Sequence, residues 1–207
     1  MKLKHVLIAI VSIIFLFSGW YAYVHRGYDI VNTPVKDGVF IAFGDSLVQG
    51  VGSEKGGGFV SVLAQKIGRP IINAGVAGNT TEDGLARLDT DVLSKKPTFV
   101  LVLLGGNDFL RRLPKEGTFA NLKEVIVRIQ KEGAVVCLLG VQGGLFSDGY
   151  SENFEALARE TGSIYVSNVL DGLVGNETYM YDTTHPNDVG YEIIADRVEK
   201  TIRPFLP

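Results

Sequence analysis

The sequence predicts a doubly wound α/β domain, in which helices cover both faces of a five-stranded parallel sheet. Three observations support this fold class: apolar runs suited to buried strands, helical patterns between them, and polar or glycine-rich segments after them. Strands that alternate with helices need crossover connections, and these connections produce a mostly parallel sheet. The five apolar runs are residues 39–43, 70–74, 98–104, 134–141 and 163–168.

The segments between these runs carry apolar residues on one helical face, which is typical of helices that pack on a sheet. In the second of them, Thr80 or Thr81 is a suitable N-cap, because its hydroxyl can accept a hydrogen bond from the first turn. We expect helices near residues 59–67, 80–93, 119–129, 151–160 and 189–202.

Residues 1–25 are predicted to form a separate N-terminal hydrophobic helix. Lys2 and Lys4 precede residues 6–24, an uncharged stretch close to the roughly 20 residues that cross a bilayer. The lack of a clear small-x-small cleavage site favours an uncleaved membrane anchor over a signal peptide, which would give a secreted protein. The lysines would hold the N-terminus in the cytoplasm and the rest of the chain outside it, at the cell surface or in the periplasm. The segment has no cysteine for a lipoprotein-type attachment.

Beyond the anchor, residues 26–38 have no periodicity and indicate a linker to one domain at 39–207. The chain is 46% hydrophobic and 21% charged, which is typical of a globular protein with a core. A net charge of −3 with scattered basic residues argues against nucleic-acid binding. The single cysteine, Cys137, lies in an apolar run, so we expect a buried strand residue without a disulfide.

Two polar segments near opposite ends of this domain predict a serine hydrolase. Phe43-Gly44-Asp45-Ser46-Leu47 follows the first apolar run, and Asp182-Thr183-Thr184-His185-Pro186 precedes the last predicted helix. A hydroxyl that attacks a carbonyl needs a base, and the base needs a carboxylate to hold its tautomer. Ser46, His185 and Asp182 are candidates for these three roles.

Two glycine-rich segments add to this interpretation. Residues 73–80 follow the second apolar run, and Gly105-Gly106-Asn107-Asp108 follows the third. Each polar segment taken alone is also compatible with an ordinary turn or helix cap. Because the carboxyl ends of parallel strands meet at one edge of the sheet, all four segments are expected to converge there, as in an active site.

The same segments resemble the conserved blocks of the SGNH hydrolases, also called the GDSL lipase/esterase family. The blocks are residues 43–47, 78–80, 105–108 and 182–186, and the stretch from Asn73 to Leu88 is most similar to the bacterial thioesterase I/lysophospholipase and arylesterase branch. The resemblance covers about residues 39–205 and implies a flavodoxin-like, SGNH-type fold.

The resemblance also implies a role for each matching residue. Ser46 would be the nucleophile, His185 the base and Asp182 the group that orients the base. The oxyanion hole would consist of the Ser46 and Gly78 amides and the Asn107 side chain. No metal or other cofactor is implied, and His5, His25 and His185 are too far apart in the sequence to suggest a metal site.

The expected function is hydrolysis of carboxylic esters of short- to medium-chain acyl groups, and thioesters are further candidate substrates. The enzyme would be monomeric and similar to lysophospholipases or arylesterases. Small-molecule or lipid esters would be the substrates, and the membrane a partner through the N-terminal helix. An O-deacetylase of cell-envelope polysaccharide is the alternative enzyme; a non-catalytic binding module or a purely structural membrane protein would not need the complete set of polar residues. Apolar residues in the rim loops would bind the acyl chain: Phe109, Leu110, Leu145, Phe146 and Tyr181.

Overall fold

The computed structural model describes residues 27–141 and 150–207 of the chain. In this part, five parallel strands form a sheet in the order β2-β1-β3-β4-β5, so the doubly wound, flavodoxin-like prediction is confirmed. Each strand lies within two residues of a predicted apolar run. The strands are β1 (Val39–Gly44), β2 (Ile71–Gly75), β3 (Pro97–Leu103), β4 (Val135–Leu139) and β5 (Ile164–Val166).

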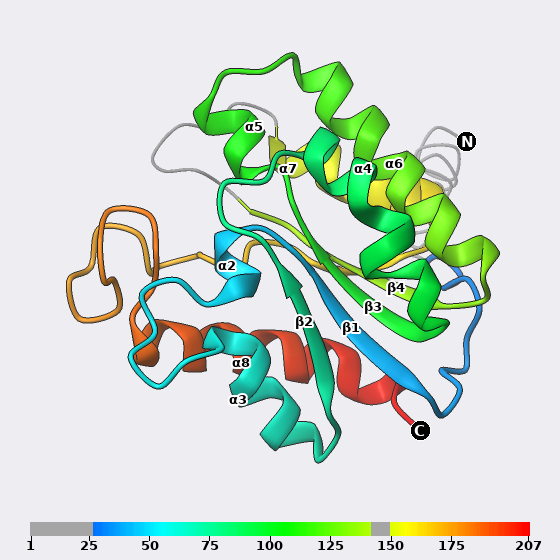
Figure 1. The fold of residues 1–207 in the computed structure, drawn as a ribbon, viewed down its shortest axis with the longest axis horizontal. Helices are drawn as coiled ribbons and strands as arrows, with labels where there is room; N and C mark the ends of the chain where they lie inside the picture. The colour runs from blue at the N-terminus through cyan, green and yellow to red at the C-terminus, as the bar shows by residue number, and fades with distance from the viewer. Residues whose placement is uncertain (1–26, 142–149) are drawn as a thin grey trace, which may run out of the picture.

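Helices cover both faces of the sheet (Figure 1). On one face, α3 (Gly58–Ile67) packs against α8 (Asp188–Ile202), and on the other lie α4 (Thr81–Asp91), α6 (Lys115–Lys131) and α7 (Tyr150–Thr161). Each turns its apolar face inward, as the periodicity predicts. Shorter elements complete the described chain: α2 (Ser46–Gln49), α5 (Gly106–Leu110) and the 3₁₀ turns η1 (Leu93–Lys95) and η2 (Arg203–Phe205).

The start of α4 shows which threonine caps it. The Thr80 hydroxyl accepts a hydrogen bond from the Asp83 amide at 3.3 Å, and the Asp83 carboxylate accepts one from the Thr80 amide at 2.9 Å. This reciprocal pair is a capping box, and it satisfies two amides that a helix start leaves open. Thr80 is therefore the N-cap, and its hydrogen bonds with Asp83 hold the end of the loop that joins β2 to α4.

The central strands are apolar on both faces because helices cover both sides of the sheet. All five residues of β4 are buried, and Cys137 among them is fully buried, as expected. Burial raises the pKa of the Cys137 thiol far above its usual range, so the residue is an apolar core side chain rather than a nucleophile.

Residues 27–38 contain neither helix nor strand, but they are fastened to the amino ends of β4 and β5. The Val31 amide donates to the Gly162 carbonyl at 2.9 Å, and the Asn32 side-chain amide donates to the Gln130 and Ala134 carbonyls at 2.8 and 2.9 Å. The anchor predicted for residues 1–25 lies outside the described residues. Within residues 27–141 and 150–207, no helix has the length and hydropathy that a bilayer crossing requires.

Candidate active site

Ser46 is placed by the sharp change of direction at the end of β1. Gly44 makes this turn possible, because a Cβ there would lie 2.2 Å from the Leu103 carbonyl oxygen and 2.4 Å from a Val48 methyl carbon. Asp45 then caps α2, accepting a hydrogen bond from the Leu47 amide at 3.0 Å. Ser46 is thus the first residue of a short helix, and it lines a cavity at the carboxyl edge of the sheet.

The loop before α8 brings His185 to Ser46. His185 Nε2 lies 3.0 Å from Ser46 Oγ, and His185 Nδ1 lies 2.8 Å from Asp182 Oδ2. The other carboxylate oxygen, Asp182 Oδ1, accepts from the Thr184 and His185 amides, both at 2.7 Å. The carboxylate therefore holds both the loop backbone and the imidazole ring, and the ring presents its second nitrogen to the serine.

The electrostatics of this loop favour an ionised Asp182. Burial acts to raise the pKa of the carboxyl, but the hydrogen bonds from the His185 ring and from the His185 and Thr184 amides outweigh it, and the net pKa lies below its usual value. A carboxylate that stays ionised can hold the Nδ1 proton of the imidazole and stabilise the imidazolium that forms when the base takes a proton.

Three candidate hydrogen-bond donors follow the ends of the neighbouring strands β1, β2 and β3. The Asn107 side-chain amide donates to the Asn79 carbonyl at 3.0 Å and lies 3.4 Å from Asp45 Oδ2. The backbone amides of Ser46 and Gly78 donate to no residue in the described part of the chain. These three groups are the ones that the family resemblance implies for an oxyanion hole, and the sheet brings the strand ends that carry them side by side.

Arg87 is a structural residue of this edge that sequence reasoning missed. Its guanidinium donates to the Gly44 carbonyl at 2.8 Å, to the Ala74 carbonyl at 3.0 Å and to Asn79 Oδ1 at 2.6 Å, and its Cζ lies 4.4 Å from the Phe43 ring centroid. It therefore joins the ends of β1 and β2 to the loop that carries Gly78. Arg87 lies in the stretch from Asn73 to Leu88 that resembles the thioesterase I branch, but nothing in the sequence around it indicates these contacts.

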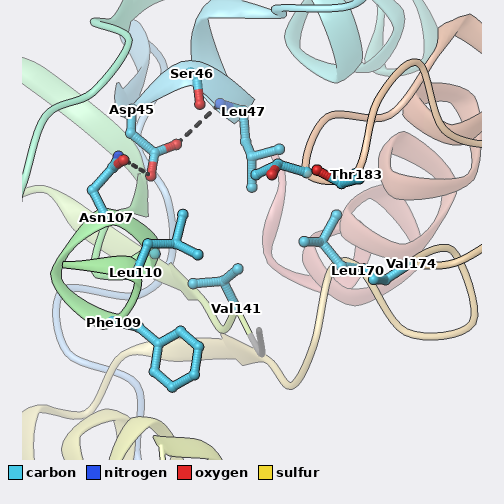
Figure 2. A pocket seen from close by; sticks show the side chains of 12 residues that line it. Asp45, Ser46, Leu47, Asn107, Phe109, Leu110, Val141, Leu170, Val174 and Thr183 are labelled. Atoms are coloured by element: carbon cyan, nitrogen blue, oxygen red, sulfur yellow. Dashed lines mark hydrogen bonds between the residues drawn. The ribbon is translucent and has the colours of Figure 1, made fainter. Parts of the chain in front are cut away.

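A cavity of about 360 Å³ opens beside Ser46 (Figure 2). Of the predicted acyl-binding residues, Phe109 and Leu110 line it, and Leu145 and Phe146 lie outside the described residues. Tyr181 does not line it: the residue is 64% exposed and its side chain lies against Gly52. The remaining apolar lining is formed by Leu47, Val141, Leu170 and Val174.

The sequence analysis did not predict Leu170 and Val174 as cavity residues, although their place in the chain indicates this role. They lie in the loop after β5, and loops after the carboxyl ends of parallel strands are where such sheets bind ligands. Tyr150, which begins α7, is buried against the Phe109 and Phe119 rings, so it packs behind the side of the cavity that Phe109 lines. Among residues 27–141 and 150–207, no three His, Cys, Asp or Glu side chains form a group that could hold a metal ion.

Comparison with known proteins agrees with this geometry. The family model described as "GDSL-like Lipase/Acylhydrolase family" matches residues 42–193, which contain all four polar segments. The chain belongs to the GDSL-like lipase/acylhydrolase family. The resemblance to SGNH hydrolases is thereby confirmed, and this member of the family is a serine hydrolase that acts on carboxylic esters.

Three relatives illustrate the range of the family. Esterase TesA of Pseudomonas aeruginosa is 29% identical over 177 residues, 80% of this chain and 88% of the relative. A crystal structure of TesA matches with a TM-score of 0.74 at 30% identity, covering 81% of this chain and 99% of that chain. Thioesterase 1/protease 1/lysophospholipase L1 of Escherichia coli K12 is 26% identical over 80% of this chain and 84% of the relative. Acetylxylan esterase of Geobacillus stearothermophilus is 27% identical over 78% and 83%.

Proposed function

We propose that this GDSL-like hydrolase cleaves its ester through an acyl-enzyme on Ser46. The observation that carries the proposal is the continuous chain of contacts from Ser46 Oγ to His185 Nε2 at 3.0 Å and from His185 Nδ1 to Asp182 Oδ2 at 2.8 Å. Ser46 Oγ attacks the ester carbonyl as His185 accepts its proton, and the imidazolium then protonates the leaving alkoxide. Water, activated by the same imidazole, hydrolyses the acyl-enzyme.

The tetrahedral intermediate carries a negative charge on the former carbonyl oxygen. We assign its stabilisation to the Ser46 and Gly78 amides and the Asn107 side chain. Donors held at fixed positions beside the nucleophile stabilise such a charge with little reorganisation, and the contacts of the Asn107 amide with the Asn79 carbonyl and Asp45 support a fixed position for this side chain. Such preorganised donors act mainly on the transition state, and they therefore raise kcat rather than lower KM.

Labelling with a fluorophosphonate tests the nucleophile directly. We expect Ser46→Ala to fold with an unchanged circular dichroism spectrum and to lose labelling and esterase activity together. Ser53→Ala is the matched control, because Ser53 lies seven residues after Ser46 in the chain but its hydroxyl is hydrogen-bonded to Asp188 at 2.6 Å. Labelling that persists in Ser46→Ala would show that another residue is the nucleophile.

The cavity supports esters of short- to medium-chain acyl groups as substrates. Its walls beside Ser46 are largely apolar, with Phe109 and Leu110 on one side and Leu170 and Val174 on the other (Figure 2). Each buried methylene contributes at most about 0.8 kcal/mol, roughly fourfold in kcat/KM. We expect kcat/KM for p-nitrophenyl esters to climb from acetate over a few carbons and then level off. Thioesters and lysophospholipids, which the name of the E. coli relative suggests, belong in the same series.

The second candidate is an O-deacetylase of cell-envelope polysaccharide, and the similarity to an acetylxylan esterase is the observation that favours it. An acetyl group would leave most of the apolar cavity unfilled, which is why we place it second. The same ester series separates the two. If only acetate is cleaved and an acetylated polysaccharide is the better substrate, the deacetylase replaces the acyl-chain esterase. The complete set of polar residues disfavours a non-catalytic binding module.

We further propose that residues 1–25 anchor the enzyme in a membrane with its hydrolase domain outside the cytoplasm. The place where the chain joins the domain supports a particular orientation. Val31 and Asn32 are bonded at the amino ends of β5 and β4, whereas Ser46 follows the carboxyl end of β1. An anchor directly before residue 27 would thus leave the cavity on the side away from the bilayer, which favours substrates that arrive from the aqueous phase.

Fractionation tests the anchor. The full chain should remain with membranes after alkaline extraction, and residues 27–207 alone should be soluble and active. A soluble mature protein whose N-terminus lies beyond residue 20 would instead show cleavage by a signal peptidase.

A further inference from the structure

Helix α5 places two side chains on the loop that carries Gly78. Asn107 and Arg111 are four residues apart, so they project from the same side of the helix, and the Arg111 amide caps α5 by donating to the Asn107 carbonyl at 2.9 Å. The Asn107 side chain donates to the Asn79 carbonyl at 3.0 Å, and Arg111 Nη2 donates to the Gly78 carbonyl at 2.7 Å. Two successive carbonyls of this loop are therefore held by one short helix.

Gly78 lies in a turn that the Asn79 amide closes by donating to the Val76 carbonyl at 3.2 Å, and side chains hold this turn on both sides of the glycine. Its φ is +80°, and glycine, which has no Cβ, populates positive and negative φ about equally. A Cβ built at Gly78 would have one neighbour within 4 Å, the Arg111 guanidinium at 3.7 Å. On the amino side of the glycine, the Ala77 amide donates to Gln49 Oε1 at 2.8 Å. Arg111 is the corresponding restraint on the carbonyl side.

We propose that Arg111 is a positioning residue for the oxyanion hole: by holding the Gly78 carbonyl, it fixes the conformation in which the Gly78 amide is presented to the reacting oxygen. The inference rests on the proposed role of Gly78. Arg111 is exposed and touches no reacting atom, so it acts only through the loop. Since the amide acts on charge that develops in the transition state, its misalignment lowers kcat more than it raises KM.

The test compares two changes at Arg111 with one at its neighbour. Arg111→Met keeps the length of the side chain and removes every donor, and Arg111→Lys restores a donor and the charge. Arg112→Ala is the matched control, because it removes a cation from the same loop at an exposed residue. The substrate is neutral p-nitrophenyl butyrate, so that charge recognition does not contribute.

For Arg111→Met we expect kcat to fall by about 10- to 100-fold with KM changed by less than about threefold, since loss of a whole donor costs roughly 10²–10³. Arg111→Lys should recover most of kcat, and Arg112→Ala should stay within about twofold of the parent. The rate constant for fluorophosphonate labelling should fall in parallel with kcat, because the phosphonyl oxygen occupies the same hole.

Three results would overturn the inference. In the first, Arg111→Met has the same kcat as Arg112→Ala. In the second, Arg111→Met lowers the melting temperature without lowering kcat, which would mean a purely structural contact. In the third, it raises only KM, and only for an anionic lysophospholipid, which would mean that Arg111 binds the headgroup. Ser46→Ala and Asn107→Ala are measured alongside. If these two lose activity as proposed while Arg111→Met does not, the positioning role fails and the proposed function stands; if they retain kcat, the proposed function itself fails.

Discussion

Replacing Asp45 with asparagine should change how the stability of this hydrolase depends on pH. Asp45 lies next to Ser46 and is 2% exposed, between the Leu47 amide and the Asn107 side chain (Figure 2). Burial is the main influence on its carboxyl and raises the pKa from its usual 3.8 to about 6, although the Leu47 amide and His185 act in the other direction. The nearby Asp108 adds a smaller increase in the pKa.

The sign and size follow from proton binding. Between pH 3.8 and about 6 the folded protein retains a proton on Asp45 that the unfolded chain has lost, so stability falls as pH rises through this window. The two pKa values differ by about 2.2, which corresponds to about 3 kcal/mol. Asparagine does not titrate. The free energy of unfolding of the parent, minus that of Asp45→Asn, should therefore drop by about 3 kcal/mol from pH 3.5 to pH 7.

Urea unfolding followed by circular dichroism at pH 3.5, 5 and 7 measures this difference. Any cost of the new amide that does not depend on pH, including its contact with Asn107, cancels between pH values. Asp171→Asn, at an exposed position, controls for the removal of one carboxylate from the molecule. Parallel stability curves for parent and Asp45→Asn, or a difference that grows with pH, would refute the assignment of a buried carboxyl that resists ionisation.

Two further predictions concern the same edge of the sheet. Asn107→Ala should lower kcat by about 10²–10³, or about 2.7–4 kcal/mol, with little change in KM; steady-state kinetics that show an effect on KM alone would mean that Asn107 holds the substrate instead. Asp108→Ala should lower the free energy of unfolding by about 3 kcal/mol, because the buried carboxylate accepts from the Thr81 amide at 2.9 Å, from the Thr81 hydroxyl at 2.5 Å and from Thr118 at 3.2 Å, and its loss leaves these donors unpaired. An unchanged urea midpoint would contradict this.

Much of the fold could be predicted because strand and helix periodicity are local properties of the chain. The apolar runs became β1 to β5 with small shifts at their ends, and the alternation with helices determined the parallel, two-sided sheet. The short helices α2 and α5 were not predicted as helices. They are four and five residues long, too short to show a periodic face, and they form because glycines and caps at strand ends turn the chain.

For the candidate site, too, the sequence predicted some features and only the structure revealed the others. The sequence by itself determined which chemical groups are present. It also determined that the candidate site residues lie just after predicted strands or just before the last predicted helix: Ser46, Gly78, Asn107, Asp182 and His185. Only the tertiary structure decided which apolar rim residues face the cavity: Phe109 and Leu110 line it, Tyr150 packs behind it and Tyr181 lies on the surface. The direction of a loop side chain depends on what packs beneath the loop, and that neighbour is distant in the sequence.

The same reason explains Arg87 and Arg111. Their residue types and their places near helix ends are visible in the sequence, but an exposed arginine and a helical arginine are common and carry no signal of their own. The sheet brings the ends of β1, β2 and β3 side by side, and only then do the two guanidinium groups meet the carbonyls of Gly44, Ala74 and Gly78. The amino-acid sequence determines which hydrogen-bond donors and acceptors this enzyme has. Which donor meets which acceptor depends on the order of strands that are distant in the sequence, so only the folded structure decides it.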